Sequence, residues 1–156
     1  MAAGAKVILQ LKATIDEGWH LYSPTTPPGP IPTEIKLEAS PAVASYKVYQ
    51  PEPKRVFDPN FKQESFSFEK EVVFLIEATL SSTLPDTLDF TAASRYQVCS
   101  DTLCLRPVRR NSTVSLNSKT PAAGAAVRSV PAGYTLVPAA GEVSSSTPVP
   151  TPAPGT

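Results

Sequence analysis

The chain of 156 residues lacks an excess of either charge, because 14 Lys and Arg residues face 14 Asp and Glu residues. This balance argues against a strongly basic nucleic-acid binder and against an electrostatic membrane anchor. No run approaches about 18 continuous apolar residues, so no segment is expected to insert into a membrane. The first residues, Met1 to Lys6, lack a basic stretch followed by an apolar one. A signal peptide is therefore absent from this sequence or was removed from it.

Proline, in contrast, is abundant. The sequence has 18 prolines, which is about 12% of the chain against an average near 5%. Proline inside a helix costs about 3 kcal/mol, because it removes a backbone hydrogen bond and its ring clashes with the preceding turn. This content argues against an all-helical fold.

The composition changes near residue 117. Eleven of the twelve aromatic residues lie at or before Tyr96, whereas the last forty residues hold three charged residues and seven prolines. Such a sequence buries too little apolar surface to offset the loss of chain entropy. We therefore predict one domain over 1–117 and a Pro/Ser/Thr/Ala-rich linker or tail over 118–156. Within it, the piece from Gly133 to Val137 is read either as a short strand or as disordered chain.

Apolar residues in the first part alternate with polar ones, a pattern with period two that is typical of half-buried strands. The clearest case runs from Lys6 to Ile15, and 87–98 is predicted as one long strand. The continuous apolar run over 72–76 indicates a strand buried on both faces. Shorter patterns lie near 34–38, 46–48, 65–69 and 113–116. Seven to nine strands separated by turn signals predict an all-β fold, an antiparallel β-sandwich.

The two cysteines, Cys99 and Cys104, follow the long predicted strand. If 100–103 form a hairpin loop, the two residues oppose each other with Cα atoms about 4.5–5.5 Å apart, within reach of a disulfide. A bridge closing a loop of about six residues stabilises by only roughly 2 kcal/mol, which favours a reactive disulfide weakly. A structural staple, a redox pair and two free thiols all stay open. Cys99, Cys104 and His20 lack a fourth ligand and a standard spacing, so neither a metal nor a cofactor is expected.

Charged residues surround the cysteines. Arg106, Arg109 and Arg110 could favour a thiolate, whereas Asp101 in the loop would oppose one. A solvated strand end is the other interpretation of the arginines. His20 is expected at the surface or at a strand edge.

Three motifs resemble the N-terminal domain family of the bacterial thiol:disulfide interchange protein DsbD, also called the disulfide bond corrector domain. The first is the segment from Glu17 to Ser23, EGWHLYS. The second is Val56 to Phe61, VFDPNF, at the place of the family's cap loop. The third is Tyr96-Gln97-Val98-Cys99 with Cys104 and Pro107, and the resemblance as a whole covers residues 6 to 116.

The resemblance implies an immunoglobulin-like sandwich with a redox-active disulfide near one end. By position, Cys104 matches the cysteine that forms mixed disulfides, and Cys99 matches its resolving partner. Phe61 matches the cap aromatic that shields the disulfide, and Tyr22 matches an aromatic near the cysteines. Asp58 lies in the cap, although Pro59 and Asn60 occupy the places where acidic residues are frequent in the family. From the sequence itself, Tyr22 and Phe61 could equally be packing residues.

The implied function is thiol–disulfide exchange in the periplasm. The family's domain accepts electrons from a thioredoxin-like domain and passes them to periplasmic disulfide oxidoreductases and to proteins of cytochrome c maturation. In the family, a linker at the place of 118–156 leads to a membrane-embedded domain, which would tether the full-length protein to the inner membrane. A monomer is expected, because no large apolar patch is marked. The alternative is a non-catalytic immunoglobulin-like binding module with a structural disulfide.

Overall fold

The computed structural model describes residues 4–117 and 130–138. Within these ranges it contains β-strands and no helix. Neighbouring strands pair antiparallel throughout. The strands are β1 (Lys6–Thr14), β2 (His20–Tyr22), β3 (Glu34–Leu37), β4 (Val43–Pro51), β5 (Lys54–Asp58), β6 (Gln63–Phe68), β7 (Glu71–Leu80), β8 (Thr87–Tyr96), β9 (Val98–Cys99), β10 (Val108–Asn117) and β11 (Tyr134–Val137). The prediction of an all-β antiparallel fold is confirmed.

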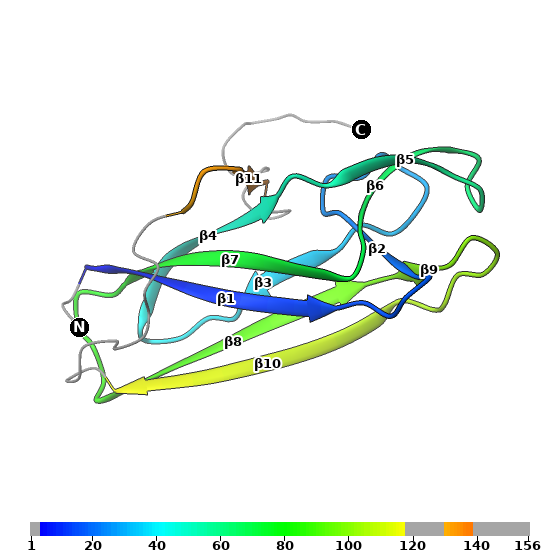
Figure 1. Ribbon diagram of the computed structural model, residues 1–156. Helices are drawn as coiled ribbons and strands as arrows, with labels where there is room; N and C mark the ends of the chain where they lie inside the picture. The colour runs from blue at the N-terminus through cyan, green and yellow to red at the C-terminus, as the bar shows by residue number, and fades with distance from the viewer. Residues whose placement is uncertain (1–3, 118–129, 139–156) are drawn as a thin grey trace, which may run out of the picture.

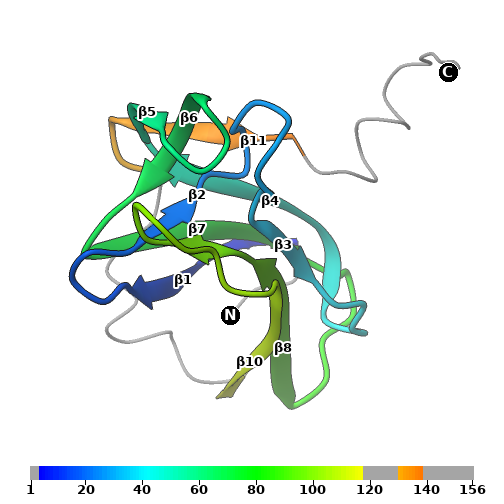
Figure 2. The ribbon, with the colours of Figure 1, turned by 90° about the vertical axis from the view of Figure 1, so that its right-hand side faces the viewer.

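The strands form three sheets, with the orders β1-β7-β4-β11, β10-β8-β3 and β5-β6-β2-β9. Figures 1 and 2 show the first two sheets as the layers of a sandwich, with the third at the end away from the N-terminus. The architecture is an immunoglobulin-like antiparallel β-sandwich, as predicted. The small third sheet carries the turn between β5 and β6 and the loop after β9 at the same end of the molecule.

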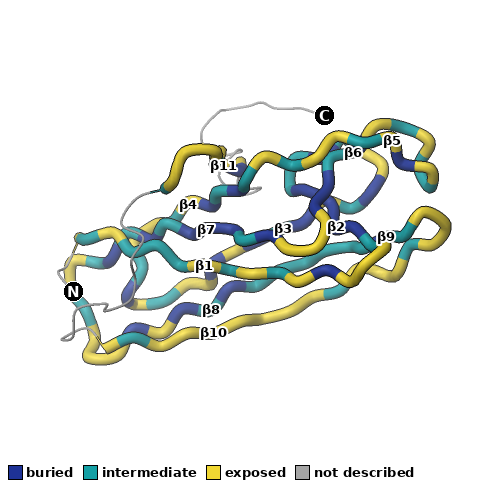
Figure 3. Tube along the Cα trace, viewed as in Figure 1, coloured by how far each residue is buried: buried dark blue, intermediate teal, exposed yellow. Residues whose placement is uncertain are grey.

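The core lies between the two larger sheets, where the alternating apolar residues meet. On β1 the residues of the predicted inner face are half-buried, whereas Lys6, Gln10 and Lys12 are exposed. On β7 the core face is almost closed to solvent, and on the opposite face Leu75 is only 2% exposed. The predicted burial on both faces therefore holds at Leu75 alone, because Val73, Glu77 and Thr79 are only partly buried. Figure 3 shows this burial concentrated in the middle of the sandwich. Large side chains of this core include Phe68, Phe74, Ile76, Leu80, Leu88 and Phe90.

One predicted strand is divided in two. The sequence pattern indicates a single strand over 87–98, but β8 ends at Tyr96 and β9 begins at Val98 in another sheet. The side chain of Gln97 explains the change of sheet: its Oε1 accepts from the Ile31 amide at 3.1 Å, and its Nε2 donates to the Leu105 carbonyl at 3.2 Å. These bonds occupy backbone groups at the point where the chain crosses between sheets.

Some strands give little or no apolar signal in the sequence. The prediction places a strand only over 113–116, whereas β10 begins at Val108, because most of this edge strand is exposed and polar. β5 is mostly exposed as well, and β2 has only three residues, all buried. Periodicity cannot show itself in three residues or along a solvated edge.

The open interpretation of Gly133 to Val137 is resolved in favour of a strand. β11 pairs with the second half of β4, and the hydroxyl of Tyr134 donates to the Val73 carbonyl at 2.9 Å. Val137 is 9% exposed, so its side chain belongs to the core. The rest of the predicted linker, 118–129 and 139–156, lies outside the described residues, and the division of the chain at residue 117 stays a prediction.

Candidate functional site

Cys99 and Cys104 form a disulfide across a four-residue hairpin loop. The Ser100 amide donates to the Leu103 carbonyl at 2.7 Å, and the Leu105 amide donates to the Val98 carbonyl at 3.0 Å. These two bonds enclose the cysteines and hold their Cα atoms 4.0 Å apart. The predicted hairpin and the opposed cysteines are therefore confirmed, with the Cα atoms somewhat closer than expected.

The two sulfur-bearing residues differ in burial. Cys99 is 0% exposed, because β9 pairs with β2 and lies inside the small sheet. Cys104 is only partly buried, and Leu103 and Leu105 on either side of it are 54% and 44% exposed. Cys104 is therefore the more solvent-exposed residue of the pair.

Strand β2 places two polar aromatic side chains beside the cysteine hairpin. His20 is the register partner of Cys99, and Tyr22 follows on the same face of β2. The turn before this strand contains Gly18 at φ 86°, a conformation that a residue with a Cβ rarely adopts. Tyr22 is completely buried and His20 is 8% exposed. The expectation that His20 lies at the surface or at a strand edge is wrong, because β2 is covered by β6 on one side and β9 on the other.

A buried carboxylate lies at the centre of this group. Asp58, at the end of β5, is 1% exposed and accepts a short hydrogen bond from the hydroxyl of Tyr22. The same oxygen, Oδ2, lies 3.6 Å from His20 Nε2 and accepts from the Ser65 hydroxyl at 3.4 Å. The distance between His20 Nε2 and the Tyr22 hydroxyl is 3.1 Å. One polar cluster within the third sheet is thus formed by Tyr22, Asp58, His20 and Ser65.

The environment changes the ionisation of two members of this cluster. Burial raises the pKa of Tyr22 far above its usual value, and the hydrogen bond to Asp58 and the charge of that carboxylate raise it further. For Asp58, burial also acts to raise the pKa. Hydrogen bonds from Tyr22 and from the amides of Asn60 and Phe61, together with His20, outweigh burial and hold its pKa below the usual value. The pair is therefore a neutral phenol bonded to a carboxylate at neutral pH.

The cap loop, which we define as Asp58 to Lys62, is folded around the same carboxylate. Asp58 Oδ1 accepts from the amides of Asn60 at 2.8 Å and Phe61 at 3.3 Å. The Lys62 amide donates to the Asp58 carbonyl at 2.7 Å, and Lys62 closes the turn at φ 55°. The Phe61 ring meets the Tyr22 ring edge to face, with centroids 6.1 Å apart.

One hydrogen bond joins the cap loop directly to the cysteine hairpin. The side-chain amide of Asn60 donates to the carbonyl of Ser100 at 2.7 Å. Ser100 directly follows Cys99, so this bond links two segments forty residues apart in the sequence. The structure thus brings Tyr22, Asp58 and Phe61 into one contact network and connects that network to Cys99 and Cys104 through Asn60.

Sequence reasoning missed three members of this network: His20, Asn60 and Ser65. The Asp-Pro-Asn turn is a recognisable signal for Asn60, because Asp accepts backbone bonds two residues on. Nothing in the sequence indicates Ser65 as a carboxylate partner. Arg110 donates to the Tyr96 hydroxyl at 2.7 Å, and Arg109 and Asp101 are exposed. No contact between the arginines and the cysteines supports activation of a thiol within the described residues.

Within residues 4–117 and 130–138, no three His, Cys, Asp or Glu side chains are grouped so that they could hold a metal ion. The described part of the chain also contains no helix long and apolar enough to cross a membrane.

Comparisons with known proteins include one family match and two similar solved structures. Residues 1–116 match the family described as Thiol:disulfide interchange protein DsbD, N-terminal. No curated protein matches the chain. Among solved structures, the N-terminal periplasmic domain of ScsB from Proteus mirabilis has a TM-score of 0.56 at 23% identity, covering 79% of this chain and 45% of that chain. The reduced N-terminal domain of Neisseria meningitidis DsbD has a TM-score of 0.48 at 14% identity, covering 74% of this chain and 82% of that chain.

Proposed function

The chain belongs to the family of N-terminal domains of the thiol:disulfide interchange protein DsbD, and we propose that it relays reducing equivalents through the Cys99–Cys104 disulfide. The observation that carries the proposal is this disulfide at an exposed hairpin end, with one buried and one accessible cysteine. A staple of this kind adds little stability, because it closes a hairpin that two backbone hydrogen bonds already close.

The first half of the relay reduces the domain. A thiolate of a thioredoxin-like domain attacks the sulfur of Cys104, which forms a mixed disulfide while the sulfur of Cys99 leaves as a thiolate and takes up a proton. The donor's second cysteine then attacks the mixed disulfide and releases Cys104. One disulfide is reduced and one dithiol is oxidised, so two electrons and two protons pass to the domain.

The second half reverses these steps with another partner. The thiolate of Cys104 attacks the partner's disulfide, and Cys99 resolves the mixed disulfide by attacking Cys104. This assignment follows the burial difference, because the buried Cys99 can reach the neighbouring sulfur of Cys104 but not the sulfur of a partner protein. The partner leaves reduced, and the domain leaves with its disulfide restored.

Phe61, Asp58 and Tyr22 are proposed to shield the disulfide from stray thiols. Support comes from the Asn60 bond to Ser100 and from the packing of Phe61 on the buried Tyr22. Asp58 organises the cap loop, because one of its carboxylate oxygens accepts hydrogen bonds from two amides of the loop. The hydroxyl of Tyr22 donates to the other oxygen and holds the carboxylate in place. A partner that displaces this loop gains access, whereas a small thiol must wait for it to open.

The setting of the reaction is part of the proposal. The related domain of ScsB is described as periplasmic, and we place this domain in the periplasm as well. Its partners are then thioredoxin-like domains and periplasmic disulfide oxidoreductases, including proteins of cytochrome c maturation. The domain acts as a monomer, and 118–156 connect it to a membrane-embedded domain in the full-length protein.

The reduction potential of the Cys99–Cys104 pair tests the proposal. Equilibration with glutathione redox buffers should give a value between about −120 and −270 mV, the range of known dithiol oxidoreductases. A value below about −300 mV would identify a structural staple, and the binding-module interpretation would replace the relay.

Trapping of partners supplies a second, independent test. Cys99→Ser leaves Cys104 without a resolving thiol. Mixed disulfides between Cys104 and oxidised thioredoxin-like proteins should therefore accumulate. Cys104→Ser is the matched control, because its remaining thiol is buried and should trap little. Equal trapping by both variants would contradict the assigned roles.

A further inference from the structure

A cleft opens along one side of the sandwich, between the outer strands of the two larger sheets. β1 is the last strand of one sheet and β10 is the last strand of the other. The cleft has a volume of about 560 Å³, within the range of roughly 300–1,000 Å³ that holds small-molecule ligands. It is separate from the Tyr22–Asp58 cluster, none of whose members lines it.

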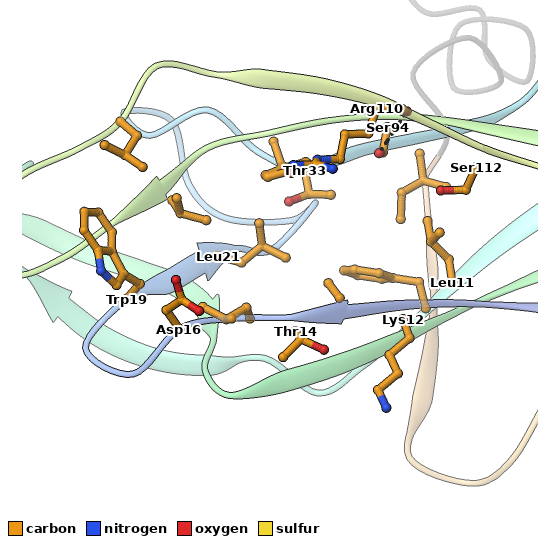
Figure 4. A pocket seen from close by; sticks show the side chains of 17 residues that line it. Leu11, Lys12, Thr14, Asp16, Trp19, Leu21, Thr33, Ser94, Arg110 and Ser112 are labelled. Atoms are coloured by element: carbon orange, nitrogen blue, oxygen red, sulfur yellow. Dashed lines mark hydrogen bonds between the residues drawn. The ribbon is translucent and has the colours of Figure 1, made fainter.

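The floor of the cleft is apolar. Leu11, Leu21, Ile35 and Phe74 line it; Leu21 comes from the third sheet and the others from the two layers of the sandwich. Figure 4 shows Trp19 at one end, Leu21 in the middle and Leu11 towards the other end. An elongated apolar molecule fits this lining, since a polar one would lose its hydration without replacement bonds.

A positive and a negative side chain lie at different places along the cleft. Arg110 lies beside Ser94 on the upper wall, whereas Asp16 lies beside Trp19 at the far end (Figure 4). The Nε of Arg110 donates to the Tyr96 hydroxyl at 2.7 Å, which leaves the two terminal amino groups of the guanidinium. Across the residues that the structure describes, Arg110 forms no ion pair with a carboxylate. Lys12 points away and lies 3.6 Å from Glu71.

We propose that this cleft binds a monomeric fatty-acid-like molecule, with the alkyl chain on the apolar floor and the carboxylate on Arg110. The guanidinium offers paired donors that match a carboxylate, and Tyr96 fixes its orientation. Asp16 disfavours the reverse orientation by repelling an anionic head group. Leu105 and Val98, which bound the stem of the cysteine hairpin, also line the cleft, so the ligand would lie next to that stem.

Trp19 supplies a built-in reporter, because it is the only tryptophan of the chain and lines the cleft. The full chain with its disulfide intact is titrated with laurate below its micellar concentration, following tryptophan fluorescence and, independently, equilibrium dialysis. Binding should saturate at one laurate per chain. Dodecanol, which has the same chain length and no charge, should bind about tenfold more weakly or worse.

Two neighbouring arginines give matched variants. Arg110→Gln should weaken laurate binding about tenfold or more, and Arg110→Lys should restore part of the loss. Arg109→Gln is the control, because Arg109 is the adjacent exposed residue of β10 and does not line the cleft, so affinity should change less than twofold. Unchanged thermal unfolding of each variant confirms that the fold is kept.

Three results would overturn the proposal. Dialysis that detects no laurate would show that the cleft is not a fatty-acid site. Equal binding of laurate and dodecanol, or equal effects of the two glutamine variants, would remove Arg110 as the head-group partner. Co-sedimentation with phosphatidylglycerol vesicles without binding of monomeric laurate would point to a membrane surface instead.

Discussion

Replacement of Asn60 by alanine should make the disulfide more reactive towards small thiols. The change removes the 2.7 Å hydrogen bond from the Asn60 side chain to the Ser100 carbonyl, the direct bond between cap loop and cysteine hairpin. The backbone of the loop is left in place, because the Asn60 amide still donates to Asp58. The variant therefore tests the hydrogen bond between the cap loop and the cysteine hairpin rather than the folding of the loop.

The expected magnitude follows from the worth of one neutral hydrogen bond. Such a bond contributes about 0.5–1.5 kcal/mol net, so its loss should raise the population of the open cap about two- to thirteenfold. If attack on Cys104 requires opening, the second-order rate of reduction by dithiothreitol rises by the same factor. Asn60→Asp should increase it further, because a carboxylate would face the Ser100 carbonyl without a proton to donate.

The assay measures reduction under pseudo-first-order conditions, with acid quenching and maleimide labelling of the released thiols. Asn111→Ala is the matched control, because Asn111 is an exposed asparagine of β10, far along the chain from the cap. Equal rates for the wild type, Asn60→Ala and Asn60→Asp would refute the reasoning. A large rise in Asn111→Ala would show that the rates report global stability.

Three further predictions concern Asp58, strand β11 and the reduced cysteines. Asp58→Asn should lower stability at neutral pH and flatten its acid dependence: the carboxylate's lowered pKa gives stability that is present above about pH 4 and is lost as the pH falls through the folded value. Chemical denaturation between pH 2 and 7 measures this, and an unchanged slope would contradict it. Tyr134→Phe should cost about 0.5–1.5 kcal/mol by removing the bond to the Val73 carbonyl, with Tyr46→Phe as the control in denaturant titrations; a cost equal to that of the control would show that β11 adds nothing through this bond. The reduced cysteine pair should react slowly with a generic small disulfide at pH 7, because no helix N-terminus in the described residues lowers a thiol pKa; fast release of a chromogenic thiol would disprove it.

The layers of the fold could be read from the sequence wherever burial is one-sided or complete. The alternation along β1 and the apolar run in β7 gave correct strands, because the period of apolar residues follows directly from which face meets the core. The edge strand β10 was mostly missed, since both of its faces are largely exposed. The break at Gln97 was missed because it depends on two side-chain hydrogen bonds to distant backbone groups.

The candidate site was predictable only in part. The separation of five residues between Cys99 and Cys104 specifies the hairpin locally, so the opposed cysteines could be derived without the fold. The role of Asn60 could not, because its partner, Ser100, is forty residues away and is brought close only by the third sheet. His20 was misplaced for the same reason: a strand of three residues gives no sign that neighbours on both sides bury it.

The small span of the disulfide has a thermodynamic consequence for the cycle that connects folding with reduction. Cys99 and Cys104 are only five residues apart, so the bridge restricts the unfolded chain by about 2 kcal/mol. The closure of the cycle then requires that folding lower the potential of the pair by only about 45 mV, since about 30 mV corresponds to 1.4 kcal/mol for two electrons. The oxidised domain is therefore more stable against unfolding than the reduced domain by about 2 kcal/mol, and reduction of the disulfide lowers the stability of the fold by that amount.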